Sequence, residues 1–211
     1  MNLRQALKLY VIPDRNAGAP RSLAEQAGLA IDGGATMIQL RDKEMSGREL
    51  FGTACRLSAL CRSRGVVFVV NDRLDIALAA GAHGVHLGME DLPVDVVRRI
   101  APAGFIIGAT AHSVEEGHLA EEQGADYAGI GAAFPTGTKT GASVIGVEGI
   151  RAVRECLSIP SVAIGGIRGD NVLEVMASGV DGIAVVASVV GREDIAGAAR
   201  SLAEKIFSVK S

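Results

Sequence analysis

A short pattern recurs along this chain and restricts the folds that it can adopt. An amphipathic segment ends in glycine, and an apolar stretch follows within a few residues, as in DGGATMIQL, AAGAHGVHLG, EQGADYAGIG and ASGVDGIAVV. Glycine just past the last helical residue is a common way to end a helix. The pattern therefore predicts repeated strand and helix units, and such repetition favours a parallel β-sheet covered by helices.

Eight apolar stretches alternate with eight amphipathic ones. Ser22 with Glu25 and Ser46 with Glu49 have the spacing of a capping box, and Pro93 is expected at the first position of its helix. The expected strands are residues 9–13, 37–41, 66–70, 84–88, 105–110, 127–131, 161–166 and 182–187, and the expected helices are 22–31, 47–64, 74–80, 93–100, 113–122, 147–157, 170–177 and 193–207.

Strict alternation of eight strands with eight helices predicts an α/β fold, a TIM (β/α)8 barrel, with residues 1–211 as one domain. The alternative is an open doubly wound sheet, which typically has five or six strands and a glycine-rich turn after the first. Here the first strand leads instead to Pro13, Asp14 and Arg15. Aromatic residues make up only 3% of the chain and Trp is absent, so we expect an aliphatic core.

Charge and targeting signals narrow the classes of partner. The formal net charge is −3, which gives no electrostatic reason to expect nucleic acid or an anionic membrane. The N-terminus has neither a long apolar run nor a small-residue cleavage site, and no stretch is apolar enough to span a bilayer. We therefore expect a cytoplasmic protein that acts on small molecules, and the sequence leaves homo-oligomerisation open.

The cysteines and histidines have no spacing typical of a metal site. Three cysteines cannot all pair within one chain, so we interpret them as reduced core or helix residues. The histidines are interpreted as structural, and His112 is expected nearest to the mouth of the barrel. The residues concerned are Cys55, Cys61, Cys156, His83, His86, His112 and His118.

The stretch MIQLRDK ends an apolar strand in a group of polar side chains. Alternation along a strand places Gln39 and Arg41 on one side and Ile38 and Leu40 on the other. A Gln or Arg inside a barrel is costly unless it meets a charge or a ligand, and barrel enzymes carry their sites at the carboxyl ends of the strands. The alternative is a surface strand end with solvated charges.

Two carboxylates, Asp72 and Asp91, are expected on neighbouring strand ends. Carboxylate oxygens with room for water suit Mg²⁺ held beside a substrate phosphate. An Asp at a strand end is also a common helix cap, and Asp91 could cap the helix at Pro93. The sequence leaves both interpretations open.

Cations and glycines at other strand ends suggest two phosphate sites. Arg41, Lys43 and Lys139 are suited to a polyphosphate. Gly165 and Gly166 follow the seventh strand and resemble the phosphate cup that many barrels build from backbone amides. The alternative readings are a tight turn for the glycines and solvated side chains for the lysines.

Six motifs in this order resemble the thiamin phosphate synthase family over nearly the whole chain. The resemblance implies that 4-amino-2-methyl-5-hydroxymethylpyrimidine diphosphate is joined to 4-methyl-5-(2-phosphoethyl)-thiazole, giving thiamin phosphate and pyrophosphate with the help of Mg²⁺. The motifs are IQLRDK (38–43), VVND (69–72), GVHLGMED (84–91), GATAHS (108–113), FPTGTK (134–139) and AIGGI (163–167).

The resemblance also implies roles for individual residues. It places Gln39, Arg41, Lys43, Asn71 and Lys139 on the pyrimidine diphosphate, Asp72 and Asp91 on Mg²⁺, and Thr136, Thr138 and the backbone of Gly166, Val186 and Ala187 on the thiazole phosphate. Leu40, Asp42, Thr110 and Gly137 complete the expected substrate-binding set, and Arg41, Lys43, Lys139 and Thr110 are the expected catalytic residues. The family usually has Ser at the position of Thr110 and often has Ser at the position of Ala187.

The implied mechanism is dissociative, with charge on the departing pyrophosphate stabilised before the thiazole nitrogen attacks. We expect the loop 132–146 to close over bound pyrophosphate through Lys139. Two alternatives remain at this stage. One is a thiazole tautomerase of the same fold, which would use His112 or its neighbours for proton transfer, and the other is a non-catalytic barrel that binds phosphate ligands.

Overall fold

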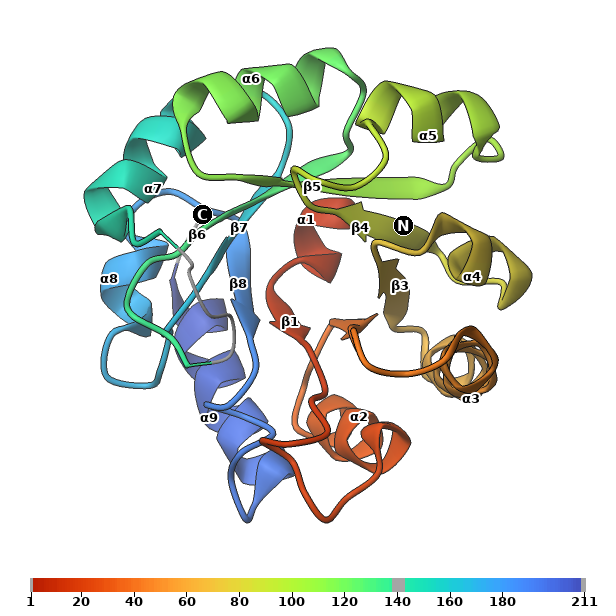
Figure 1. Cartoon of the computed structure of the whole chain (residues 1–211). Helices are drawn as coiled ribbons and strands as arrows, with labels where there is room; N and C mark the ends of the chain where they lie inside the picture. Colours follow the sequence, from red (N-terminus) through yellow and green to blue (C-terminus); the bar gives the residue numbers. More distant parts are fainter. Residues whose placement is uncertain (1, 138–142, 210–211) are drawn as a thin grey trace.

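The computed structural model describes residues 2–137 and 143–209 and contains a closed barrel of eight parallel strands (Figure 1). Each strand pairs with the next along the chain, and pairing of the first strand with the eighth closes the barrel. The predicted TIM barrel is confirmed. The strands are β1 Leu9–Val11, β2 Met37–Leu40, β3 Val67–Asn71, β4 Gly84–Leu87, β5 Ile106–Ala111, β6 Tyr127–Gly131, β7 Ser161–Ile164 and β8 Gly182–Val185.

In the part of the chain that the structure describes, eight helices, one after each strand, form a ring around the barrel in chain order (Figure 1). Both predicted capping boxes are present, at Ser22 with Glu25 and at Ser46 with Glu49. The placement of Pro93 at the first helical position was wrong, because its extended backbone (ψ 142°) makes it the N-cap. These helices are α2 Leu23–Asp32, α3 Gly47–Arg64, α4 Leu74–Ala79, α5 Val94–Ile100, α6 Val114–Glu122, α7 Gly146–Glu155, α8 Val172–Met176 and α9 Ile195–Ser208.

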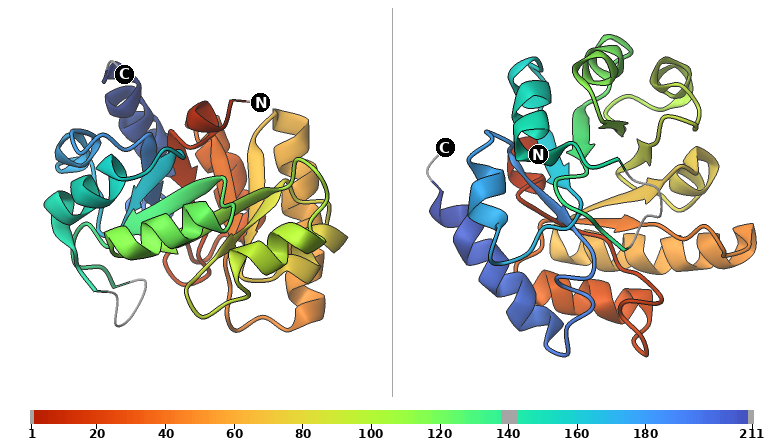
Figure 2. Two further views of the ribbon diagram at one scale, coloured as in Figure 1. Left: turned by 90° about the horizontal axis from the view of Figure 1, so that it is seen from above. Right: turned by 60° about the vertical axis from the view of Figure 1, so that its left-hand side comes forward.

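A further short helix, α1 (Leu3–Ala6), precedes β1 and was not predicted. Its residue Ala6 and the following Leu7 are buried with the side chains that fill the barrel, and the Arg4 guanidinium pairs with Asp181 at 2.5 Å. Both chain ends lie on one side of the barrel (Figure 2). Helix α1 therefore closes the N-terminal end of the barrel and leaves the opposite end for the loops that follow the strands.

The buried residues form two clusters, one inside the barrel and one between the strands and the ring of helices. Met37 belongs to the inner cluster, whereas Ile38 and Leu40 pack against the helices. Strands covered on both faces need apolar residues at almost every position. This explains why the strand sequences are nearly continuous in apolar character, and why a polar side chain on an inward position stands out.

Cys61 is buried, Cys55 and Cys156 are exposed, and all three are free thiols, as expected. Within residues 2–137 and 143–209, none of the helices combines the length and the apolar character that crossing a bilayer requires.

Candidate active site

The predicted site residues that the structure describes lie on or just after the carboxyl ends of the strands. Parallel strands bring these ends to one face of a closed barrel, so side chains far apart in sequence converge there. Thr138 and Lys139 lie outside the described residues. The other two predicted residues of the loop after β6 are described: Thr136 is half-buried and Gly137 is exposed.

The polar side chains at the end of β2 differ in how far they are buried. Gln39 is buried to 3% exposure, while Arg41 is half-buried and Lys43 is exposed. Leu40 is fully buried against the outer helices. Its side chain is directed away from the barrel interior, so a contact of that side chain with substrate is not supported, and only its backbone is available at the mouth.

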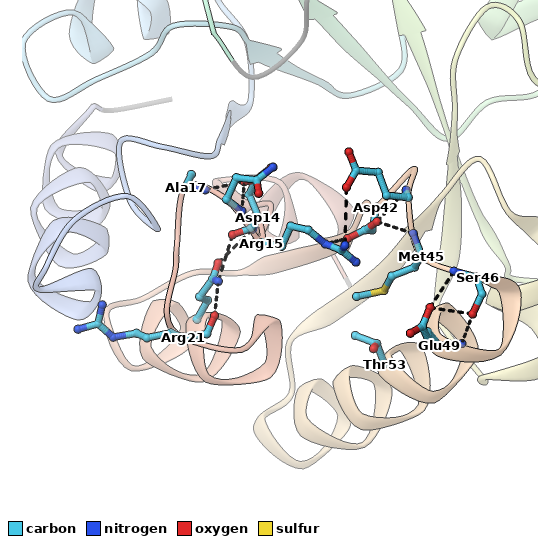
Figure 3. Close-up of polar contacts among 12 residues, drawn as sticks. Asp14, Arg15, Ala17, Arg21, Asp42, Met45, Ser46, Glu49 and Thr53 are labelled. Atoms are coloured by element: carbon cyan, nitrogen blue, oxygen red, sulfur yellow. Dashed lines mark hydrogen bonds and ion pairs between the residues drawn. The ribbon is translucent and has the colours of Figure 1, made fainter.

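Asp42, between the two cations, is held by protein groups on every side (Figure 3). One carboxylate oxygen accepts from the backbone N–H of Glu44 at 2.9 Å and of Met45 at 2.8 Å. The other lies 2.7 Å from Nε of Arg15, on the loop after β1. Asp42 was expected in the substrate-binding set, and these contacts give it the different role of fixing the loop that carries the cations.

The two acidic residues, Asp72 and Asp91, lie close together at the ends of β3 and β4. Burial, together with hydrogen bonding and charge from Asp91, raises the pKa of Asp72 to about 6, against the opposing charges of Lys43 and Arg41. Lys43 Nζ is 3.6 Å from the Asp72 carboxylate. Asp72 also has a φ of +61°, which places a non-glycine residue in the left-handed region, and such conformations concentrate at functional sites.

This pair fits a divalent cation. Burial is the largest cause of the raised pKa of Asp72, and the neighbouring Asp91 adds to it. A bound cation would stabilise both carboxylates in their charged form. Mg²⁺ prefers oxygen ligands and often takes only one or two carboxylates, completing its shell with water and phosphate. Among the described residues, no group of three or more His, Cys, Asp or Glu side chains is placed to hold a metal ion.

The competing interpretation of Asp91 as a helix cap is wrong. Helix α5 has no side-chain cap, since its N-cap residue is Pro93. The Asp91 carboxylate instead accepts a 2.6 Å hydrogen bond from the backbone N–H of Gly88, within its own loop. That contact holds the loop after β4 and aims the carboxylate at the mouth beside Asp72.

A chain of hydrogen bonds crosses the interior of the barrel beneath the mouth. Gln39 Nε2 donates to the Tyr10 hydroxyl, which lies 3.1 Å from the Tyr127 hydroxyl. The Tyr127 hydroxyl is 3.0 Å from Nδ1 of His86, and Nε2 of His86 is 3.1 Å from Oγ1 of Thr110. Burial raises the pKa of Tyr10 and of Tyr127, so both remain protonated phenols. Two expected substrate residues, Gln39 and Thr110, are the ends of this chain.

Sequence reasoning missed Tyr10, Tyr127 and the position of His86. The structural interpretation of the histidines holds for His83, whose Nδ1 accepts from the Phe68 N–H at 3.0 Å. His112 lies at the mouth, as expected, and its Nδ1 pairs with Glu116 at 2.9 Å. The available signal for His86 was its alternation with apolar residues on β4, which predicts an inward side chain.

On the opposite side of the barrel, the turns after β7 and β8 present unused backbone amides. Gly165 and Gly166 have φ values of +102° and +63°, which turn the backbone sharply after β7. After β8, the N–H groups of Val189 and Val190 close onto the carbonyl of Val186. Among the described residues no hydrogen bond uses the N–H of Ala187. A turn with free amides at its start has the geometry that can bind an anion.

Comparisons with known proteins find similar sequences over nearly the whole chain. A family model described as thiamine monophosphate synthase matches residues 9–189. The thiamine-phosphate synthase of Coprothermobacter proteolyticus is 51% identical over 204 residues, or 97% of each chain, and that of Pyrococcus furiosus is 48% identical over 209 residues, or 99% of each.

Solved structures extend the similarity to three dimensions. A thiamine phosphate pyrophosphorylase from Pyrococcus furiosus has a TM-score of 0.91 and 48% identity, with 98% of each chain covered. A 3-hexulose-6-phosphate synthase has a TM-score of 0.68 at 19% identity. The second likeness concerns the barrel fold alone.

Proposed function

This chain belongs to the thiamine monophosphate synthase family, and from that premise we propose how its residues carry out the reaction. The activity is that of a thiamine-phosphate synthase, a transferase of thiamine biosynthesis. The substrates are a pyrimidine diphosphate and a thiazole phosphate. The observation that carries the proposed mechanism is the acidic pair Asp72 and Asp91, with Lys43 and Arg41 acting on Asp72.

The first step is loss of the diphosphate from the pyrimidine. The bond between the methylene carbon and the bridging oxygen breaks, and its electron pair leaves on the oxygen. Arg41 and Lys43, with Lys139 from the loop after β6, offset the negative charge that builds up there. Mg²⁺ held by Asp72 and Asp91 would supply further positive charge beside the same phosphates. The aminopyrimidine ring delocalises the cation that remains.

The pyrimidine is placed by the side chains beneath the diphosphate. Gln39 and Asn71 offer amide groups to the ring and its substituents, and Thr110 offers a hydroxyl to the diphosphate. Since Gln39 is almost fully buried, this part of the site is shielded from bulk water. Exclusion of water matters because water would otherwise capture the cation.

The thiazole phosphate is held by the turns after β7 and β8. The amides of Gly166, Val186 and Ala187, with the hydroxyls of Thr136 and Thr138, bind the phosphate and leave the thiazole nitrogen facing the pyrimidine methylene. The nitrogen lone pair then forms the new carbon–nitrogen bond, and no proton has to move. The protein therefore contributes placement and electrostatics more than acid–base chemistry.

The two alternatives from the sequence are weaker. A thiazole tautomerase has no use for an acidic pair beside cations, and thiamine-phosphate synthases match this chain almost from end to end. A non-catalytic phosphate-binding barrel would have no leaving group for those charges to serve.

The test is to incubate the pure protein with both substrates and Mg²⁺ and to quantify thiamin phosphate and pyrophosphate. We expect both products in equal amounts, and neither when Mg²⁺ is chelated. Ser58→Ala serves as a matched control, because it removes a buried hydroxyl that donates to Gly81 at 3.0 Å, outside the site. Absence of thiamin phosphate from the wild-type reaction would refute the proposal.

A further inference from the structure

The hydrogen-bond chain inside the barrel has a direction that its chemistry determines. An amide NH₂ group can only donate, each tyrosine hydroxyl carries one hydrogen, and a neutral imidazole has one donor and one acceptor nitrogen. The donor at one end therefore sets the donor at every later step. Because Gln39 donates to Tyr10, the Tyr10 hydrogen is left for Tyr127.

The same order of donors continues to the far end of the hydrogen-bond chain. The Tyr127 hydrogen is donated to Nδ1 of His86, so the imidazole hydrogen resides on Nε2. That nitrogen donates to Oγ1 of Thr110, and the Thr110 hydroxyl keeps its own hydrogen for another acceptor. At the near end, the described residues give the carbonyl oxygen of Gln39 no hydrogen-bond partner. The chain thus ends in an acceptor on β2 and a donor on β5.

Two glycines leave space inside the barrel for the hydrogen-bonded side chains. A Cβ at Gly108 would lie 2.1 Å from the Tyr127 ring, and a Cβ at Gly129 would lie 3.0 Å from the His86 ring. The rings also pack on each other, with centroids 6.2 Å apart for Tyr10 and Tyr127 and 5.5 Å apart for His86 and Tyr127. Buried polar groups that are all hydrogen-bonded specify one arrangement of a core.

We propose that Tyr10, Tyr127 and His86 are positioning residues that fix the orientation of Gln39 and Thr110 for substrate. In this arrangement the Gln39 carbonyl accepts a hydrogen bond from the exocyclic amine of the pyrimidine. The Thr110 hydroxyl donates a hydrogen bond to the anionic diphosphate. One buried chain therefore couples recognition of the ring to recognition of its leaving group. This inference rests on the proposed function only for the identity of the substrate. The direction of the hydrogen-bond chain does not depend on it.

The direction is tested without any substrate. In protein labelled with ¹⁵N at histidine, NMR shifts distinguish a hydrogen on Nε2 from one on Nδ1, and His86→Gln identifies the signal of His86. We expect the hydrogen on Nε2. A hydrogen on Nδ1 would reverse every donor along the chain and overturn the inference, whatever the activity of the enzyme.

The consequence for binding is tested by Tyr10→Phe and Tyr127→Phe, which keep the ring and remove the hydroxyl. Losing one link frees the Gln39 amide to rotate, and we expect the KM for the pyrimidine diphosphate to rise about tenfold, the effect of one lost hydrogen bond. The KM for the thiazole phosphate should change by less than about twofold, since its site is built from backbone amides.

Ser58→Ala is the control for a buried hydroxyl lost elsewhere in the core. It should lower the Tm without changing either KM. The inference is overturned if both tyrosine variants fold and bind the pyrimidine diphosphate as the wild type does, or if they raise both KM values equally. The hydrogen-bond chain would then have only a structural role. An inactive wild-type enzyme would instead refute the proposed function, and the NMR result would still stand.

Discussion

Asp72 lies in a setting that disfavours its ionised form. Burial and the neighbouring Asp91 raise its pKa to about 6, whereas an Asp in an unfolded chain has a pKa of about 3.9. A raised carboxyl pKa means that the folded state binds protons more tightly. This residue therefore favours folding below about pH 4, and that contribution is lost as the pH rises through about 6.

We predict that Asp72→Asn makes the metal-free protein more stable at pH 8 and nearly inactive. The neutral amide removes the repulsion from Asp91, and Asn tolerates the positive φ better than most residues. Turnover should fall at least about a hundredfold, because the charge of a catalytic metal is worth several kcal/mol. Asp91→Asn should lose activity similarly. Calorimetry without metal and steady-state assays with Mg²⁺ measure the two effects, and an unchanged rate would rule out the metal assignment.

Protons and Mg²⁺ should compete for the same carboxylates. We predict that saturating Mg²⁺ raises the Tm more at about pH 8 than at about pH 5, where Asp72 is protonated in the folded state. Asp72→Asn should show little Mg²⁺-dependent rise at either pH. Equal rises at both pH values in the wild type would show that the ion binds elsewhere.

At the scale of single residues, the location of the polar side chains at the mouth could be predicted from the sequence, because they directly follow predicted strands. Asp72 and Asp91 lie together as expected. The role of Asp42 could not be predicted, since its partner Arg15 is on a different loop. Tyr10 and Tyr127 are separated by 117 positions, and only the closed barrel brings them into contact.

At the scale of elements, the turn after β7 carries Gly166, whose backbone we propose for the thiazole phosphate. A Cβ at Gly166 would lie 2.7 Å from the Pro135 carbonyl oxygen and 2.8 Å from Cβ of Phe134, in addition to the strain of a positive φ. The obstacle to a side chain here is thus the loop after β6. Because Ala187 is exposed, a hydroxyl added there meets no such obstacle.

We predict that Gly166→Ala raises the KM for the thiazole phosphate by at least about tenfold, because moving the turn misaligns the amides that bind the anion. Ala187→Ser, which restores the residue more common in the family, should change that KM by less than about twofold. Steady-state kinetics with varied thiazole phosphate gives both values. A large improvement for Ala187→Ser would mean that a hydroxyl, and not the amides, dominates binding.

The expected elements match the structure to within a few residues at their ends, because glycine punctuation and apolar runs are local signals. Helix α1 was missed because four residues are too few to show a helical period. The division of each strand into inner and outer faces was equally hidden, since strands buried on both faces are apolar throughout. The inward direction of Gln39 could be predicted, because a buried polar side chain in such a strand needs a hydrogen-bond partner.

At the scale of the whole molecule, the two ends of the barrel have separate tasks. The N-terminal end is closed by α1 and by Leu7, which is fully buried. The opposite end carries the cations and the acidic pair, and Lys43 there is exposed over 66% of its side chain. In barrel enzymes the first end serves stability and the second serves catalysis, so substitutions at the two ends should affect different measurements.

We predict that Leu7→Ala lowers the free energy of unfolding by about 2–5 kcal/mol, the usual range for a buried leucine, and leaves both KM values and kcat unchanged. Lys43→Ala should do the reverse, with little loss of stability and a large loss of turnover, because its charge is used only when diphosphate departs. Urea denaturation and steady-state assays on the same preparations separate the two. In the double variant the effects should add, since sites without shared contacts behave independently. A Leu7→Ala enzyme that is folded but slow would show that the closed end of the barrel takes part in shaping the active site.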